Sequence, residues 1–398
     1  MTAHSFFATC PRGLEEPLAR ELERCGADGT RQVGGGVHFD GDPAGGLAAC
    51  YRANLHSRIA SRILWRVAAA PYATEHDIYA AALRVAWPEH FHVARTIRVD
   101  VAAIRSPVKS LEFVTLRVKD AVCDRFRADA GGRPDVDTRA PEVRIHAFLE
   151  AGSVTFYLDT SGEALWKRGW RSGTGEAPIR ENLAAGIIAL TGWQPGEPFL
   201  DPMCGSGTFV IEAAGIALER APGSRRGFGF EKLAGFDAAL WHRLRDEARA
   251  KERPRAPLPI HGSDLSGAEL AQARGAIESA GLTGVVQLKQ ANALELSPPA
   301  PAGVLIANPP YGVRLGGDRE LEAFYPRLGD ALKARFAGWR CYLFTADAAR
   351  LAKRLGLRAS RRIPLYNGPL ECRLLEYRIV AGSMRRKRPA PTQQGAAG

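Results

Sequence analysis

Four consecutive residues in the second half of the chain, Asn308-Pro309-Pro310-Tyr311, carry groups that could activate an aromatic amine. The exocyclic amine of a nucleobase is a poor nucleophile, because its lone pair is delocalised into the ring. The Asn308 amide oxygen and the Pro309 carbonyl could accept the two amine hydrogens and localise the lone pair, while Tyr311 stacks on the base. Taken alone, so short a motif is better explained as a turn with an anchoring tyrosine, because short motifs match by chance.

A glycine-containing loop earlier in the chain is typical of a cofactor site. It reads Asp201-Pro202-Met203-Cys204-Gly205-Ser206-Gly207-Thr208. A buried strand is expected at 196–200 and an apolar helix at 209–218, which is the strand–loop–helix order of a nucleotide-type site. No lysine follows Gly207 and the G-x-G-x-x-G pattern is absent, so phosphate-loop and dinucleotide sites are disfavoured. An acid followed by two glycines suits S-adenosyl-L-methionine, a ligand without phosphate.

Alternating strand and helix patterns after residue 179 predict an α/β fold that places both motifs at one edge of a sheet. An apolar strand at 303–307 leads into Asn308, and a strand at 260–264 ends in Asp264. An acid at the tip of the second strand of such a sheet can bind ribose hydroxyls. Two late strands, at 363–366 and 374–380, have no full helix between them and predict an antiparallel end to the sheet.

The first 160 residues predict α+β units without catalytic spacing. Residues 5–45 read as strand, helix and strand, and the alternating runs at 143–149 and 154–158 predict a hairpin. The stretch from 160 to 180 interleaves two tryptophans with basic residues, so it could bind nucleic acid or serve as an anchored linker. We therefore predict four parts, at residues 1–45, 46–159, 160–384 and a basic tail at 385–398.

Composition restricts the class of protein and partner. The chain has 398 residues, 45% hydrophobic and 24% charged, which fits an ordinary globular protein. Seven scattered cysteines without a C-x-x-C pair disfavour a disulfide framework and a zinc site, and fit a reducing cytoplasm. The start lacks a signal-peptide pattern. The net charge of +11 falls entirely on residues 161–398, which favours a polyanion such as RNA.

These motifs together are similar to those of a known family. Their order and spacing resemble the class I methyltransferases, and the wider chain resembles the bacterial THUMP-domain RNA methyltransferases, in particular the 23S rRNA guanine-N2 subfamily. The resemblance runs from residue 5 to about 380 and includes the stretches 6–15, 51–58, 177–185 and 228–232. It implies a ferredoxin-like segment and a THUMP RNA-binding domain, followed by a Rossmann-like catalytic domain with a seven-stranded sheet.

The resemblance also implies roles for individual residues. Asp201, Pro202, Cys204 and the Gly205-Ser206-Gly207-Thr208 turn would hold the methionine part of S-adenosyl-L-methionine, Asp264 the ribose, and Asn308–Tyr311 the target base. Asn292 stands where the family usually has an acid that accepts from the adenine amine, so its amide oxygen would accept there without charge.

The expected reaction is direct methyl transfer to guanine N2, which needs no metal. Cys204 lies in the cofactor loop, and the 308–311 turn holds no nucleophile, so a covalent route is disfavoured. Alternatives with the same fold are adenine N6 in RNA and guanine N2 in tRNA. An RNA-binding or assembly protein without catalysis is a further alternative.

Overall fold

The computed structural model describes residues 4–41, 46–170, 179–310 and 318–381, without the side chains of residues 318–321. Tyr311, much of the tryptophan-containing connector and the basic tail lie outside the described residues. Within the described part of the chain, no helix is both long and apolar enough to cross a membrane.

The N-terminal half forms one seven-stranded sheet in the order β2-β3-β1-β4-β7-β6-β5. Its strands are β1 (Ser5–Thr9), β2 (Asp28–Val33), β3 (Gly36–Asp40), β4 (Arg62–Pro71), β5 (Ile97–Ala103), β6 (Val143–Leu149) and β7 (Ser153–Asp159). β1 pairs antiparallel with β4, placing Phe6 opposite Trp65, so a single sheet spans the first two predicted parts. β6 and β7 form the predicted hairpin. β2 was not predicted, because its largely exposed residues lack an apolar alternation.

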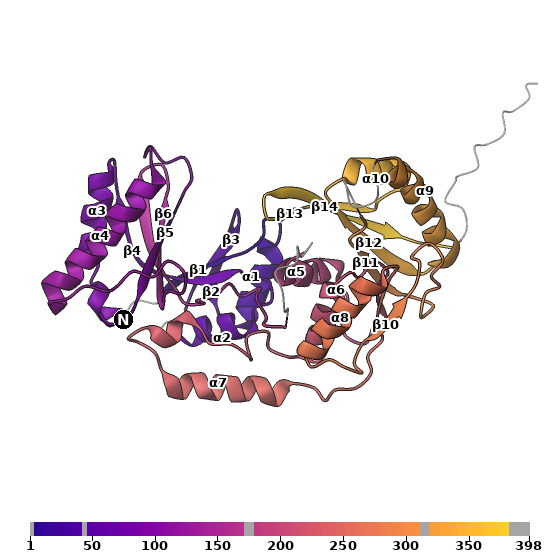
Figure 1. Cartoon of the computed structure of the whole chain (residues 1–398), viewed down its shortest axis with the longest axis horizontal. Coiled ribbons are helices and arrows are strands. Elements are labelled where there is room, and N and C mark those ends of the chain that lie inside the picture. The colour runs from indigo at the N-terminus through magenta and orange to yellow at the C-terminus, as the bar shows by residue number, and fades with distance from the viewer. Residues whose placement is uncertain (1–3, 42–45, 171–178, 311–317, 382–398) are drawn as a thin grey trace, which may run out of the picture.

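Four helices accompany this sheet: α1 (Glu15–Arg24), α2 (Ala48–His56), α3 (Glu75–Arg84) and α4 (Leu111–Ala130), with a short 3-10 turn, η1 (Trp87–Glu89). α3 and α4 pack together beside β4, β5 and β6 (Figure 1). The Ser110 side chain caps α4 by accepting from the Phe113 amide. The sequence predicted only residues 116–126 of α4, because Leu111 and Phe113 are exposed and disturb the apolar period of its first turn.

The C-terminal half contains a second seven-stranded sheet in the order β10-β9-β8-β11-β12-β14-β13. Its strands are β8 (Phe199–Asp201), β9 (Ile260–Asp264), β10 (Gln287–Gln290), β11 (Gly303–Ala307), β12 (Trp339–Thr345), β13 (Arg361–Asn367) and β14 (Leu370–Arg378). β14 runs antiparallel to β12 and β13, as the sequence predicted. The chain moves from β8 outward to β9 and β10, then returns to place β11 on the other side of β8. Open α/β sheets typically bind ligands at such a reversal, which lies here at the carboxyl ends of β8 and β11.

Helices cover both faces of this second sheet. They are α5 (Glu181–Thr191), α6 (Thr208–Ala217), α8 (Gly267–Ser279), α9 (Asp318–Arg335) and α10 (Ala348–Arg354). Alternate residues of β11 point into different cores. Val304 and Ile306 pack in the cluster that holds α5 and α6, whereas Leu305 and Ala307 pack in the cluster that holds α9 and α10. This burial on both faces explains the continuous apolar run before Asn308.

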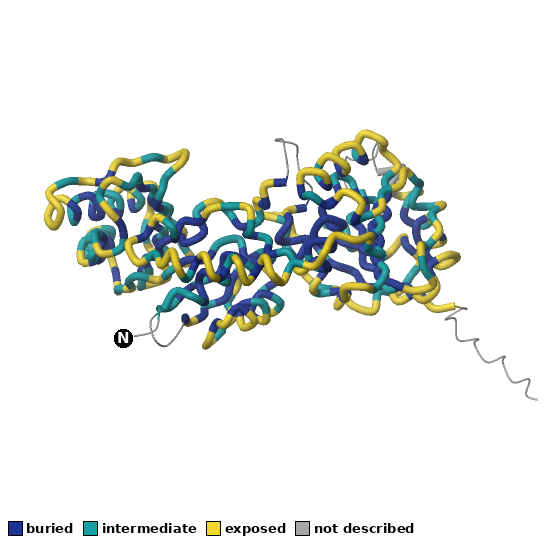
Figure 2. Tube along the Cα trace, turned by 90° about the horizontal axis from the view of Figure 1, so that it is seen from below, coloured by how far each residue is buried: buried dark blue, intermediate teal, exposed yellow. Residues whose placement is uncertain are grey.

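The two halves pack closely against each other. α7 (Ala238–Lys251) lies below α2 in Figure 1, after the short turn η2 (Gly229–Lys232). The Tyr51 ring of α2 stacks on Phe230 at a centroid distance of 4.3 Å, and the Trp241 ring of α7 meets Phe230 edge-on at 5.0 Å. One hydrophobic cluster therefore runs through both halves, and Figure 2 shows buried segments along the molecule.

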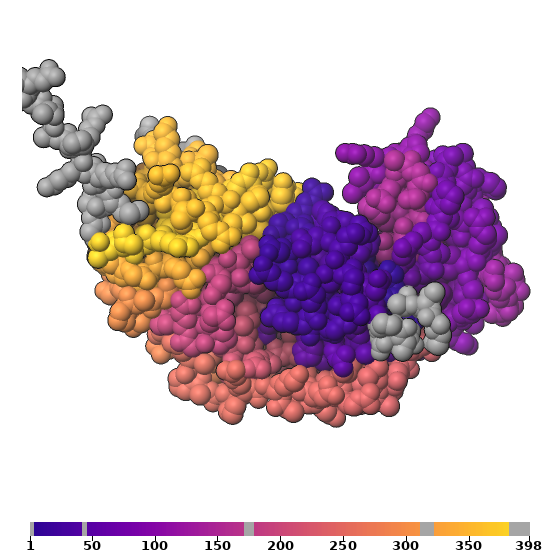
Figure 3. All heavy atoms as spheres, turned by 180° about the vertical axis from the view of Figure 1, so that it is seen from behind, coloured from indigo at the N-terminus to yellow at the C-terminus, as the bar shows by residue number. Residues whose placement is uncertain are grey.

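A second contact joins the start of the chain to the second sheet. Gly13, at φ +90°, lies so close to β13 that an added Cβ would stand 2.4 Å from the Pro364 carbonyl oxygen. The Leu14 side chain fills the space over Gly186 of α5. Figure 3 shows the indigo N-terminal segment against the yellow C-terminal part of the chain.

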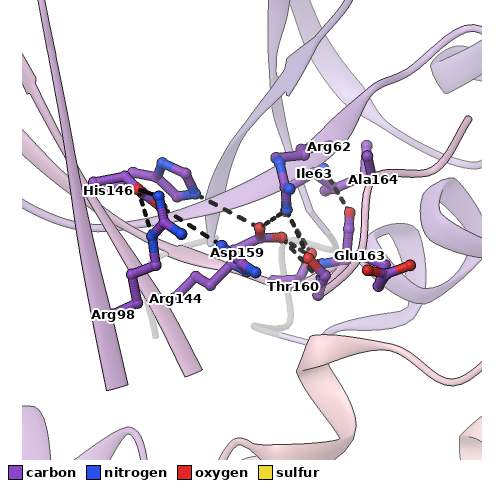
Figure 4. Close-up of polar contacts among 12 residues, drawn as sticks. Arg62, Ile63, Arg98, Arg144, His146, Asp159, Thr160, Glu163 and Ala164 are labelled. Atoms are coloured by element: carbon purple, nitrogen blue, oxygen red, sulfur yellow. Dashed lines mark hydrogen bonds and ion pairs between the residues drawn. The ribbon is translucent and has the colours of Figure 1, made fainter. Parts of the chain in front are cut away.

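A polar network surrounds the point where β7 leaves the first sheet (Figure 4). The buried Asp159 carboxylate pairs with Arg62 and accepts from the Ser161 amide at 2.8 Å. Burial alone would raise the pKa of Asp159, but His146 and Arg62 outweigh it and hold that pKa below its usual value. Arg226 donates to the carbonyl oxygens of Ser161, Glu163 and Ala164, and so ties the insertion before α7 to this connection.

Glu212 of α6 forms a deeply buried ionic link between the halves. Its carboxylate, 2% exposed, contacts Arg58 Nη1 at 3.0 Å and Arg168 Nε at 3.2 Å. Arg58 follows α2, whereas Arg168 lies in the connector. Replacing Glu212 would leave two guanidinium groups buried without their counter-charge.

We therefore expect Glu212→Gln to lower the free energy of unfolding by about 3–5 kcal/mol, the usual cost of removing one partner of a buried pair. Urea unfolding measures this, with Asp330→Asn as the control. The Asp330 side chain is 77% exposed and pairs with Lys333 on the surface, so its loss should change stability by less than about 0.5 kcal/mol. Equal midpoints for the two variants would contradict this role of Glu212.

Candidate functional site

The described candidate residues meet at the carboxyl edge of the second sheet. Asp201 ends β8 opposite Gly262, and Asp264 extends β9 two residues further. On the other side of β8, Leu200 pairs with Leu305, so Asn308 follows β11 just beyond the level of Asp201. Asn292 follows β10, whose Gln290 pairs with Asp264. The parallel register thus brings together residues that lie more than a hundred positions apart in the sequence.

The glycine loop is held in a tight turn. Gly205 and Gly207 have φ values of +49° and +81°, which other residues adopt only with strain. The Gly207 amide donates to the Cys204 carbonyl at 2.8 Å, and the Cys204 amide donates to the Ser263 carbonyl of β9 at 2.8 Å. α6 then begins at Thr208. Its first amides have no acceptors within the helix, so the turn presents backbone donors at this edge.

Asp264 braces this loop, a role that the sequence did not reveal. One carboxylate oxygen accepts from the Gly205 amide at 2.9 Å and the other from the Ser266 amide at 2.9 Å. Ser266 in turn caps α8 by accepting from the Glu269 amide at 3.3 Å. Each Asp264 oxygen retains a second lone pair. The predicted contact with ribose is therefore compatible with this bracing and stays a prediction.

Asp201 is buried, with 1% of its surface exposed, and one of its oxygens accepts from the Met203 amide at 3.2 Å. Burial, reinforced by the negative charge of Asp264, raises the pKa of Asp201 well above its usual value. A cationic group bound beside Asp201 would act in the opposite direction and favour the carboxylate. A sulfonium or ammonium group is therefore the kind of ligand that this acid fits.

Cys204 packs inside the loop as a thiol. Burial, with the charges of Asp201 and Asp264, raises the pKa of Cys204 above its usual value, which disfavours the reactive thiolate. Its sulfur lies against Gly262, where an added Cβ would approach Sγ to 3.3 Å and Leu288 Cδ2 to 2.7 Å. Of the other loop residues, Pro202 is buried and Ser206 is partly exposed.

Asn292 is engaged in a local turn. Its amide oxygen accepts from the Leu294 amide at 3.0 Å, and its Nδ2 donates to Glu295 Oε1 at 3.1 Å. The Ala291 amide donates to the Asp264 carbonyl at 3.0 Å, which fixes this turn beside β9. The structure therefore places a carboxylate, that of Glu295, next to the residue where the sequence lacked one. The contact of Asn292 with adenine stays a prediction.

Asn308 has an unusual environment. Its amide oxygen is buried and has no hydrogen-bond partner among the described residues. A buried acceptor without a partner costs about 1–3 kcal/mol, so such atoms are rare in proteins and are often functional. Pro309 is buried, and the Pro310 carbonyl accepts from the hydroxyl of Tyr325 at 3.1 Å. Tyr311 lies outside the described residues. No sequence pattern singled out Tyr325, because its contact with Pro310 forms only in the folded chain.

Models of three protein families match the chain. A model of the RMKL-like methyltransferase domain matches residues 168–376, one of the THUMP domain matches 72–159, and one of the RlmL ferredoxin-like domain matches 5–64. The resemblance and the fold class inferred from the sequence are thereby confirmed.

Two curated relatives, from Aeromonas salmonicida and Shewanella amazonensis, are each named ribosomal RNA large subunit methyltransferase K/L. They are 41% and 40% identical to this chain over 399 and 393 residues. The matches cover 95% and 98% of this chain but only 55% of each relative. The chain thus spans about half the length of the curated relatives it matches.

Solved structures share the fold over nearly the whole chain. SMU.472, crystallised as a complex with SAH, has a TM-score of 0.85 and 31% identity, covering 96% of this chain and all of that one. A protein from Listeria monocytogenes, described as a predicted N6-adenine-specific DNA methylase, has a TM-score of 0.85 and 29% identity, covering 95% and 97%. TrmN from Thermus thermophilus, at 21% identity and a TM-score of 0.70, shows a common fold alone.

The raised pKa of Asp201 predicts how stability depends on pH. Above about pH 4 the unfolded chain releases this proton, whereas the folded chain retains it until the pH reaches the higher pKa of the folded state. The stability that Asp201 contributes is therefore present below about pH 4 and lost as the pH rises. Since asparagine does not titrate, the stability of the wild type relative to Asp201→Asn should fall as the pH rises above about pH 4.

Thermal unfolding of the ligand-free wild type and Asp201→Asn, at about pH 4 and again at about pH 7, measures this difference in stability. A difference that stays constant or grows with pH would contradict a raised pKa for Asp201. Stabilisation by S-adenosylhomocysteine, measured in the same way, should be lost in the variant.

Proposed function

Because the chain belongs to the RMKL-like methyltransferase family, we propose that it is an S-adenosyl-L-methionine-dependent RNA methyltransferase acting on the exocyclic N2 amine of a guanine in 23S rRNA. The observation that carries this proposal is the buried amide oxygen of Asn308, for which no described residue is a hydrogen-bond partner, at the end of the strand next to the one that leads into the glycine loop. An acceptor held in this way requires a donor, and an aromatic amine supplies two hydrogens for donation.

The residues at the carboxyl edge suit the cofactor. S-adenosyl-L-methionine, when bound, supplies an electrophilic methyl group on a sulfonium. Asp201 and the Gly205–Thr208 turn would hold its methionine part, Asp264 the ribose and Asn292 the adenine. The buried Asp201 carboxyl, whose pKa is raised in the ligand-free chain, supports this assignment because it favours a cationic partner.

The turn at 308–310 would prepare the amine for attack. The Asn308 oxygen and the Pro309 carbonyl accept the two amine hydrogens, which localises the lone pair on nitrogen and directs it towards the cofactor. Tyr311, which lies outside the described residues, would stack on the base. Because the chain needs only to orient and polarise the reacting groups, positioning accounts for its main contribution.

The N-terminal half would bind the RNA. Its THUMP and ferredoxin-like matches support this role, as does the name of the relatives. The excess positive charge on residues 161–398 would attract the phosphate backbone near the catalytic half. A base must be unstacked to reach the turn, which favours a loop or a partly unfolded RNA. We propose that the protein works in the cytoplasm, which contains rRNA and keeps cysteines reduced.

Adenine N6 is the second candidate target, favoured by the Listeria monocytogenes structure described above. The turn can accept two hydrogens from either base. Mass spectrometry of nucleosides from 23S rRNA and tRNA of a deletion strain would distinguish the two. We expect one N2-methylguanosine of 23S rRNA to disappear and to return when the gene is restored. The proposed substrate would be contradicted if the N2-methylguanosines of 23S rRNA stayed unchanged while an N6-methyladenosine or a tRNA modification was lost.

Asn308→Ala should keep the affinity for S-adenosylhomocysteine and lower the rate of methyl transfer about 10²-fold or more, the usual effect of removing one fixed polar group at the reacting centre. Calorimetry and a single-turnover assay with radiolabelled cofactor measure the two effects. Asn308→Asp, which keeps an acceptor, should retain more activity than the alanine variant. Normal rates in Asn308→Ala would show that the assigned role is wrong.

A further inference from the structure

We infer that Tyr325 is a positioning residue, whose hydroxyl holds the Asn308–Pro310 turn in the shape needed to receive the target amine. This inference rests on the proposed function. Tyr325 belongs to α9, which follows the turn in sequence and covers the sheet face that includes Leu305 and Ala307.

The contact is direct and well protected. The Tyr325 side chain is fully buried, and its hydroxyl donates to the Pro310 carbonyl at 3.1 Å. The ring packs in the hydrophobic cluster that also holds Leu328 and Ala307. A ring enclosed in this way cannot easily move its hydroxyl, so it gives the turn a fixed anchor.

Few other backbone rotations are possible in the turn, so one hydrogen bond can fix its conformation. Pro309 and Pro310 restrict their own φ angles, so the remaining backbone rotations are mainly the ψ angles around them. Binding of the Pro310 carbonyl restricts the last of these rotations. The preceding Pro309 carbonyl and the Asn308 side chain then have a defined direction, although neither touches Tyr325 in a hydrogen bond that the structure records.

The hydroxyl remains a donor over the working pH range. Burial, with the negative charge of Asp347 and against the positive charge of Arg350, raises the pKa of Tyr325 to about 12. Asp347 follows β12, the strand next to β11, so it lies at the same edge of the sheet. A neutral phenol can donate to a carbonyl, whereas a phenolate could not.

A second tyrosine offers a matched control. Tyr342 of β12 is 2% exposed, and its hydroxyl donates to the Thr191 carbonyl at 3.2 Å. Burial also raises the pKa of Tyr342. The two hydroxyl groups thus make the same kind of bond at similar length, but only that of Tyr325 touches the candidate catalytic turn.

The test compares Tyr325→Phe with Tyr342→Phe in the full chain. Each removes one hydroxyl and the hydrogen bond that it donates to a backbone carbonyl, so we expect small decreases in the melting temperature in both variants. We expect kcat for methyl transfer to rRNA to fall about tenfold in Tyr325→Phe, because small misplacements of reacting groups reduce rates strongly. Its KM for S-adenosyl-L-methionine and its Kd for S-adenosylhomocysteine should not change, and Tyr342→Phe should keep the kcat of the wild type.

A wild-type kcat in Tyr325→Phe would overturn the inference while leaving the proposed function intact. So would an equal loss of kcat in both variants, since that would reflect a structural effect. A wild-type chain that binds S-adenosylhomocysteine poorly and transfers no methyl group would overturn the proposed function, and the role of Tyr325 with it.

Discussion

The buried amide oxygen of Asn308 is the constraint on which the candidate site depends. It is fixed at the end of a strand buried on both faces, and two prolines follow it. The chain cannot satisfy this acceptor with any described residue, at a cost of about 1–3 kcal/mol. That cost is reasonable if a ligand supplies the missing donor. The neighbouring strand β8 leads into the glycine loop, so the parallel register brings this acceptor and that loop to the same edge of the sheet.

The acidic residues at the ends of β8 and β9 show a similar constraint. Asp201 and Asp264 lie on adjacent strands, and burial of Asp201 disfavours its charge. Two backbone amides donate to Asp264, which thereby holds the glycine loop in place. Asp201 is then the acid available to a cationic ligand. The acidic residues of the ligand-free site therefore favour a cationic ligand. Burial of Asp201 lowers the stability of the folded chain but strengthens the binding of such a ligand.

The sequence predicted the order of the motifs and the strands that end at Asp264 and before Asn308, because apolar runs bounded by glycine and proline reflect local backbone requirements. It did not predict the bracing role of Asp264, the approach of Glu295 to Asn292, or the bond from Tyr325 to Pro310. These depend on side chains from separate segments that meet only after folding. It also missed β2 and the first turn of α4, where exposed residues obscure the apolar period. The continuity of β1 with β4 is likewise a tertiary pairing without a local signal.

The close packing of the two halves, through Glu212, Leu14 and the aromatic cluster around Phe230, gives the N-terminal half a fixed relation to the carboxyl edge of the second sheet. The most direct test of the whole account is a crystal structure of the chain with S-adenosylhomocysteine and a short guanine-containing RNA. We expect the cofactor sulfur over the glycine loop and the guanine N2 within hydrogen-bonding distance of the Asn308 oxygen. A guanine amine remote from Asn308, or a cofactor bound away from Asp201, would contradict the account.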